Sequence, residues 1–162
     1  MIYLDAGATT LQKPERVRRA MYSAVAVMSS PGRGSYPATR LAEETDFQCR
    51  SLAAELFDVD DPARVVFTCC ATHGLNIAIK TLVKPGSRVI ISGYEHNAVT
   101  RPLHGIPDTA LTVIDTPLFR PEVMLAEFGQ ALDAGADAVI CTHVSNVFGY
   151  RLPVEDIAAL CR

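Results

Sequence analysis

The sequence predicts a three-layer α/β/α fold built on a mostly parallel sheet. From residue 64 onward, short apolar runs rich in Val and Ile alternate with longer segments of helical character. This alternation is typical of βαβ units, whose strands run parallel. Because crossovers between parallel strands are right-handed, we expect helices on both faces of the sheet. The 162 residues are enough chain for one proper core.

The N-terminal part predicts two helices separated by a loop. After an extended start at residues 1–5, Pro14 stands where a helix begins, and apolar residues then recur at helical spacing. The run SSPGRGSYP (29–37) breaks this helix with two glycines and two prolines. A second, longer helix follows as far as Leu56. Cys49 lies on its apolar stripe and is expected in the core.

Four strands and four helices are expected in the rest of the chain. The strands are predicted at residues 64–69, 88–92, 110–115 and 136–144, and the helices at 74–83, 98–105, 121–135 and 153–162. The last helix reaches the end of the sequence, whereas a parallel sheet usually continues past such a helix. We therefore expect a chain that is cut short.

Composition and charge argue against several classes of function. The net charge of −3 argues against a surface that binds nucleic acid. The basic run ERVRR (15–19) is interpreted as a solvated helix face. No apolar run reaches the ~18–20 residues of a membrane span, and the first residues lack a signal-peptide pattern. The five cysteines, an odd number without framework spacing, indicate reduced thiols and a cytoplasmic location.

The stretch FTCCATHGLNIAIK (67–80) is the first candidate site. It lies between a predicted strand and a predicted helix, where ligands bind in open α/β sheets, and the free amides of a helix start can hold a phosphate. Ala71 and Thr72 supply those groups. Neighbouring strand side chains point to opposite faces, so Cys69 and Cys70 are poorly placed to share zinc, and we expect no metal. A nucleophilic pair of Cys70 and His73 remains an alternative. The favoured interpretation is that the two cysteines are small buried residues beneath an anion-binding loop.

Two further strand ends carry polar residues. Glu95, His96 and Asn97 follow the strand at 88–92, and Thr142, His143, Ser145 and Asn146 follow the strand at 136–144. Parallel strands bring their carboxyl ends to one edge of the sheet, so these groups are expected to converge with the phosphate loop.

Five motifs in this order resemble the N-terminal half of the pyridoxal-phosphate-dependent cysteine desulfurases and selenocysteine lyases, within the class V aminotransferase group. They are YLDAGATT, SSPGRGSYPAT, FTCCATHGLNIAIKTL, YEHNAV and THVSNVFGYRLPVEDIAALC. The resemblance implies the large domain of a fold type I pyridoxal-phosphate enzyme. Residues 1–37 would then be an N-terminal arm with the first helix and loop. Residues 38–162 would be the first half of the cofactor-binding domain, without its remainder and without the small domain.

The resemblance also implies roles for individual residues. Ala71 and Thr72 would bind the cofactor phosphate, and His96 would stack on the pyridine ring as the catalytic histidine. Asn146 would bond the phenolic oxygen of the ring and lie near the substrate carboxylate. Such contacts orient the ring and tune its electrons. Ala8 and Thr9 would line the substrate side of the pocket.

Some positions depart from the family pattern. Ala6 stands where the family usually has asparagine, Cys69 and Cys70 replace a Ser-Gly or Arg-Gly pair, and His73 replaces a common glutamate. The family's ring-facing aspartate, cofactor-binding lysine and sulfur-accepting cysteine would all lie beyond residue 162, so we expect this chain to be inactive alone.

The implied activity is conversion of L-cysteine to L-alanine, with the sulfur passing to an enzyme cysteine, as in sulfur metabolism and iron–sulfur cluster assembly. Implied partners are a small cysteine-like amino acid, a second copy of the chain in a homodimer, and a sulfur-acceptor protein, with no nucleic acid or membrane. Two alternatives stay open. One is another class V activity, such as a lyase or an epimerase; the other is a non-catalytic half-protein that acts as a binding or assembly module.

Overall fold

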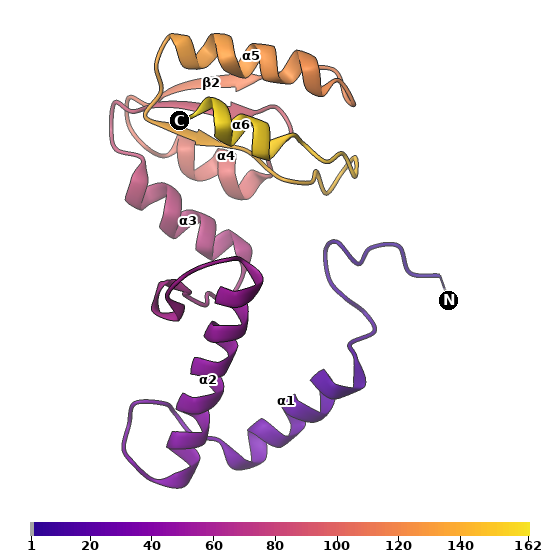
Figure 1. The fold of residues 1–162 in the computed structure, drawn as a ribbon, viewed down its shortest axis with the longest axis vertical. Coiled ribbons are helices and arrows are strands. Elements are labelled where there is room, and N and C mark those ends of the chain that lie inside the picture. Colours follow the sequence, from indigo (N-terminus) through magenta and orange to yellow (C-terminus); the bar gives the residue numbers. More distant parts are fainter. Residues whose placement is uncertain (1) are drawn as a thin grey trace. The chain divides into compact units, whose positions relative to one another are not determined.

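The computed structural model describes residues 2–162, and Met1 of the expected extended start lies outside the described residues. The chain forms two compact units, one ending at Phe67 and one running from Thr68 to Arg162 (Figure 1). The boundary predicted at residue 37 concerns the domain layout of a longer enzyme, and it stays a prediction. No helix within residues 2–162 is both long enough and apolar enough to cross a bilayer.

The first unit contains two α-helices and a short 3₁₀-helix. They are α1 (Glu15–Val27), α2 (Pro37–Leu56) and η1 (Pro62–Arg64). Pro14 precedes α1 and Pro37 opens α2, which agrees with the preference of proline for helix starts, where its missing N–H costs nothing. The predicted positions of both helices and of the loop between them are confirmed.

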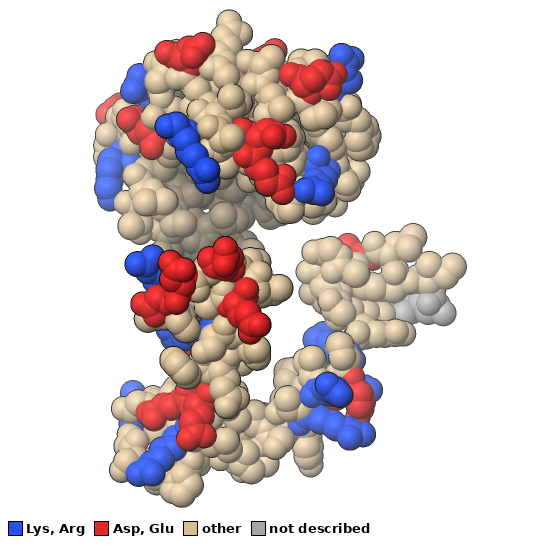
Figure 2. Space-filling model, viewed as in Figure 1, with Lys and Arg blue, Asp and Glu red and all other residues tan. Residues whose placement is uncertain are grey.

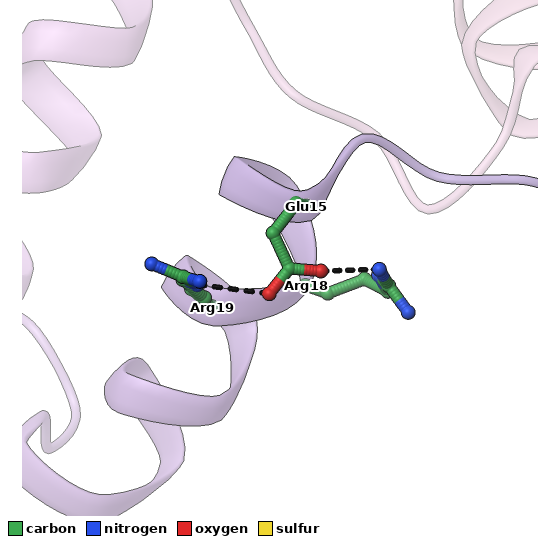
Figure 3. A network of polar contacts seen from close by, with 3 residues as sticks. All are labelled: Glu15, Arg18 and Arg19. Atoms are coloured by element: carbon green, nitrogen blue, oxygen red, sulfur yellow. Dashed lines mark hydrogen bonds and ion pairs between the residues drawn. The ribbon is translucent and has the colours of Figure 1, made fainter.

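Helix α1 presents charged side chains to solvent. Glu15 accepts hydrogen bonds from Arg18 and Arg19, one turn further along the helix (Figure 3). No residue of α1 is buried. The interpretation of the run 15–19 as a solvated face is therefore confirmed. Figure 2 shows basic and acidic side chains over most of the face drawn, with basic side chains predominating over α1.

The expected core position of Cys49 is wrong, because its side chain is exposed. Helix α2 buries only Thr39 and Ala54. An apolar stripe is buried only where another element packs on it, and the element packed against α2 is η1. Leu52 and Leu56 of the same helix are likewise exposed.

The second unit is a parallel sheet covered by helices. Its elements are α3 (Ala71–Leu82), β1 (Arg88–Ser92), α4 (Asn97–His104), β2 (Ala110–Ile114), α5 (Pro121–Asp133), β3 (Ala138–Ile140) and α6 (Val154–Leu160). The strand order is β2-β1-β3, with both pairs parallel. In the register, Val89 of the central strand lies between Leu111 and Ala138.

The alternation of side chains along β1 builds two cores, one on each face of the sheet. Ile90 packs with Phe128 of α5 and Ile157 of α6. The flanking β1 residues point the other way and pack with Ile79 of α3 and Val99 of α4. The predicted three-layer arrangement is therefore confirmed (Figure 1).

Two predicted strands differ from the structure. Residues 64–69 do not form a strand: η1 ends at Arg64, and residues 65–70 have no ladder partner among the described residues. A β-prone sequence becomes a strand only when a neighbour accepts its hydrogen bonds. Strand β3 stops at Ile140, well before the predicted end at residue 144. The N–H of Thr142 donates to the side chain of Glu95 instead of continuing the ladder.

Candidate functional site

The start of α3 offers backbone donors that have no carbonyl partner within the helix. Cys70 is the N-cap, in extended conformation (φ −167°, ψ 166°), and its side chain does not cap the helix. The N–H groups of Ala71, Thr72 and His73 therefore stand in the first turn, where a helix has no carbonyl for them. Because the helix dipole is positive at this end, the site suits an anion such as a phosphate.

The two cysteines at this start are exposed, so the expectation that they are small buried residues is wrong. That expectation required a strand at residues 64–69, which would have turned one of the two side chains into the sheet core. Without the strand, both thiols face solvent beside the helix start. The structure also pairs Cys69 with His73, at 3.3 Å between Sγ and Nδ1, rather than Cys70.

His96 caps helix α4. Its Nδ1 accepts a hydrogen bond from the N–H of Ala98 at 3.0 Å, and an accepting Nδ1 leaves the ring proton on Nε2. The ring is therefore held in one orientation by the backbone, while the side chain remains exposed. Sequence reasoning assigned His96 a stacking role and missed the cap. A polar residue directly before a predicted helix was the available signal.

Thr72 and His96 line one cavity of about 770 Å³ between α3 and α4. Its lining also includes three basic residues, Lys80, Lys84 and Arg101. Both lysines lie in the C-terminal part of α3 or just after it. Lys84 Nζ donates to the carbonyl of Thr81 at 2.6 Å. Three cations and no carboxylate in the lining favour a negatively charged ligand.

Asn146 lies in the loop that follows β3. This loop folds back on itself: the N–H of Ser145 donates to the carbonyl of Tyr150 at 2.9 Å, and Gly149 adopts a left-handed φ of +62°. Asn146 is exposed in the turn. Because β1 and β3 are parallel neighbours, His96 and Asn146 both follow carboxyl ends at the same edge of the sheet. Asn146 is outside the cavity that Thr72 and His96 share.

The carboxylate of Glu95 ties the two loops together. Its Oε1 accepts from Ser92 Oγ at 2.5 Å and from the Thr142 N–H at 2.6 Å. Burial raises the pKa of Glu95, and these two hydrogen bonds partly oppose the rise. Burial, followed by the charge of Glu95, raises the pKa of the nearby Cys141 thiol to about 12. Sequence reasoning placed Glu95 at this edge but did not find its bonding role, since that depends on a contact across 47 residues.

Ala8 and Thr9 belong to the first unit. Their N–H groups both donate to the carbonyl of Asp5, at 3.1 and 3.2 Å, and so form a tight turn. Their expected role on the substrate side of the pocket stays a prediction.

Three comparisons place the chain among known proteins. The family model described as aminotransferase class-V matches residues 2–162. The chain is 33% identical over 175 residues to the cysteine desulfurase IscS of Vibrio vulnificus, covering 99% of this chain and 41% of that protein. It is 28% identical over 164 residues to a probable cysteine desulfurase of Vibrio cholerae, covering 97% and 40%. The apo cysteine desulfurase structure from Thermococcus onnurineus NA1 superposes with a TM-score of 0.86 at 23% identity, covering 98% of this chain and 40% of that one.

The chain belongs to the aminotransferase class-V family. The resemblance found in its motifs is confirmed, and so is the fold class, which the superposition shows at the level of the fold. Enzymes of this family depend on pyridoxal phosphate. The chain spans about 40% of the length of the curated relatives it matches.

Proposed function

We propose that this chain supplies the phosphate-binding and ring-stacking part of a pyridoxal-phosphate-dependent, cysteine desulfurase-like enzyme. One observation carries the proposal: Thr72, among the first-turn amides of α3, and the ring of His96, which caps α4, line the same basic cavity. The donor set fits the cofactor, because a phosphate takes backbone N–H groups and cations, and an aromatic cofactor takes a flat side chain.

In this proposal each residue has a separate task. The N–H groups of Ala71 and Thr72, with the Thr72 hydroxyl, bind the phosphate. His96, oriented through its bond to the Ala98 N–H, stacks on the ring. Asn146 holds the phenolic oxygen and the substrate carboxylate, and Ala8 and Thr9 border the substrate. The cofactor, when bound, supplies an electron sink for the amino acid.

The proposed reaction converts L-cysteine to L-alanine and passes the sulfur to an enzyme cysteine. Support comes from relatives that are named cysteine desulfurases, one of them 33% identical over nearly the whole chain. The lysines of this sequence are Lys13, Lys80 and Lys84, and none stands at the family's covalent cofactor position. We therefore assign the covalent attachment and the sulfur transfer to residues outside 1–162. A lyase or epimerase of the same family would use the same phosphate and ring contacts and is the alternative.

We further propose a homodimer, a sulfur-acceptor protein as partner, and a cytoplasmic location. The support for association is the number of large apolar side chains exposed on α2, among them Leu56 at 77%. Apolar patches of this kind mark contact surfaces.

The test is binding of pyridoxine phosphate, which carries the phosphate and ring but no aldehyde that could react with surface lysines. Equilibrium dialysis against the purified chain should show saturable binding. Thr72→Val should weaken it about ten-fold or more, because a hydrogen bond to a charged group is worth about 1.5–3 kcal/mol. Thr112→Val, at an exposed position of β2 outside the cavity, is the matched control and should bind like the unchanged chain.

Two results would contradict the proposal. Equal affinity of the Thr72→Val and Thr112→Val variants would remove α3 as the phosphate site. Sustained alanine and sulfide release from cysteine by residues 1–162 alone, above the rate with free pyridoxal phosphate, would show that the covalent and sulfur-accepting groups lie within this chain.

A further inference from the structure

Two thiols and an imidazole meet at the start of α3, and the proposed cofactor chemistry uses none of them. Cys69 Sγ lies 3.3 Å from His73 Nδ1, and Cys70 is the N-cap of the helix. Both cysteines are exposed. Adjacent thiols beside a base at a helix start are unlike the other cysteines of the chain, so they call for a chemical explanation.

The backbone holds Cys70 in a fixed position. Its carbonyl accepts from Thr68 Oγ1 at 3.0 Å and from the Gly74 N–H at 3.1 Å. The space between these donors is narrow, since a Cβ on Gly74 would lie 3.2 Å from Thr68 Oγ1. Because the carbonyl is held from both sides, the Cys70 side chain stays at the positive end of the helix dipole.

This position stabilises a thiolate on Cys70. The nearby backbone N–H of His73 is the largest cause that lowers the pKa of the Cys70 thiol, and desolvation opposes it. The Cys69 side chain and then the N–H and hydroxyl of Thr72 lower this pKa further. A thiolate, rather than a thiol, is the attacking species in sulfur chemistry. Cys69 is in turn oriented by the ring of His73. The three side chains therefore form a series in which His73 positions Cys69 and Cys69 supports Cys70.

We propose that Cys70 is a modification site for small disulfides, with Cys69 and His73 as positioning residues. The Cys70 thiolate attacks one sulfur of the disulfide, and a new S–S bond forms as the disulfide bond of the reagent breaks. The released thiolate takes a proton from water. Cys70 is oxidised and the leaving sulfur is reduced, so no other oxidant is needed. The inference does not require bound cofactor.

The chain provides its own controls for the test. Cys49 is exposed on α2, away from any helix start. Cys141 is half-buried, with a thiol pKa raised to about 12. The reduced chain is treated with hydroxyethyl disulfide and quenched with acid at intervals. Digestion and fragment spectra then give a rate for each cysteine and separate Cys69 from Cys70.

Cys70 should form the mixed disulfide about three- to ten-fold faster than Cys49 at neutral pH, with a half-maximal rate at lower pH. Cys141 should stay unmodified. Preferential labelling of Cys69, or a Cys70 rate no greater than that of Cys49, would overturn the proposal. This comparison is made within the unchanged protein, so it does not depend on any variant folding.

The positioning roles are tested by the pH midpoint of the Cys70 rate. Cys69→Ala and His73→Ala should both move the midpoint upward, and Cys69→Ser, which keeps a donor, should restore most of the shift. A purely structural role would not produce rescue by serine. Identical midpoints in all four proteins would refute the series from His73 through Cys69 to Cys70.

Discussion

The carboxylate of Glu95 accepts a hydrogen bond from the backbone N–H of Thr142 at 2.6 Å, although 47 residues separate them in the sequence. This bond joins the loop after β1 to the loop after β3. His96 is the residue next to Glu95, and Asn146 lies four residues after Thr142. The contact therefore sets the spacing between the two loops that carry the proposed ring-binding residues.

Removal of the Glu95 carboxylate should destabilise the second unit. Glu95→Ala leaves the hydroxyl of Ser92, which is 1% exposed, and the Thr142 N–H without their acceptor, at a cost of about 1–3 kcal/mol. Glu95→Gln keeps one acceptor oxygen and should lose less of the unfolding free energy than Glu95→Ala. Urea denaturation measures the change, with Glu127→Ala on the exposed face of α5 as the control. Equal stabilities of the Glu95→Ala and Glu127→Ala variants would contradict the bonding role.

The free energy of unfolding should depend on pH through the ionisation of the same carboxyl group. Burial raises its pKa above the ordinary value of 4.5, so the folded state keeps the proton over a range in which the unfolded state has lost it. The proton-linked part of the Glu95 contribution to the free energy of unfolding is full below pH 4.5 and is lost as pH rises through the folded pKa, whereas the part from its acceptor bonds remains. The difference in unfolding free energy between the unchanged chain and Glu95→Gln should follow this course. A difference that is constant with pH, or that grows as pH rises, would reverse the assignment.

His96 has two roles, as the N-cap of α4 and as the proposed stacking surface. Two substitutions distinguish these roles. Asparagine is a good N-cap, whereas alanine leaves the Ala98 N–H unpaired, at a cost of about 0.5–2 kcal/mol. Thermal unfolding should therefore show a loss for His96→Ala and little change for His96→Asn. Both variants should weaken binding of pyridoxine phosphate, since neither has a ring. Full binding by His96→Asn would show that the histidine acts through the helix start alone.

Pyridoxine phosphate should slow the modification of Cys70. The thiolate and the phosphate are both stabilised by the amides at the start of α3, so the two anions compete. The rate at Cys49 in the same sample is the internal reference and should not change. A reactive Cys70 that the phosphate does not protect would uphold the thiol site and contradict the phosphate assignment.

The chain should self-associate through apolar side chains of α2. Leu52 and Leu56 are 65% and 77% exposed on one stripe of this helix. Light scattering over a range of concentrations should show dimers or larger species. Leu52→Glu combined with Leu56→Glu should shift the distribution toward monomer, whereas Arg40→Glu on the same helix should not. A monomer at all micromolar concentrations would exclude the contact.

The predicted helices and strands match the structure where the local sequence pattern agrees with the packing of neighbouring elements. Strand β1 was placed correctly because its apolar run is buried on both faces, by α3 and α4 on one side and by α5 and α6 on the other. The strand expected at residues 64–69 has equally β-prone residues but no partner in the described sheet. The predicted burial of Cys49, Cys69 and Cys70 is wrong for the same reason. Each prediction assumed a neighbouring element that does not pack there.

The sequence by itself determined the alternation of strands and helices, the family and the residues at the carboxyl ends of the strands, because these follow from local order along the chain. Only the tertiary structure decided which groups contact one another. The bond between Glu95 and Thr142, the shared cavity of Thr72 and His96, and the choice of Cys69 as the partner of His73 are examples. Such contacts depend on distances of a few ångströms between side chains, and these distances are set by the packing of the whole unit.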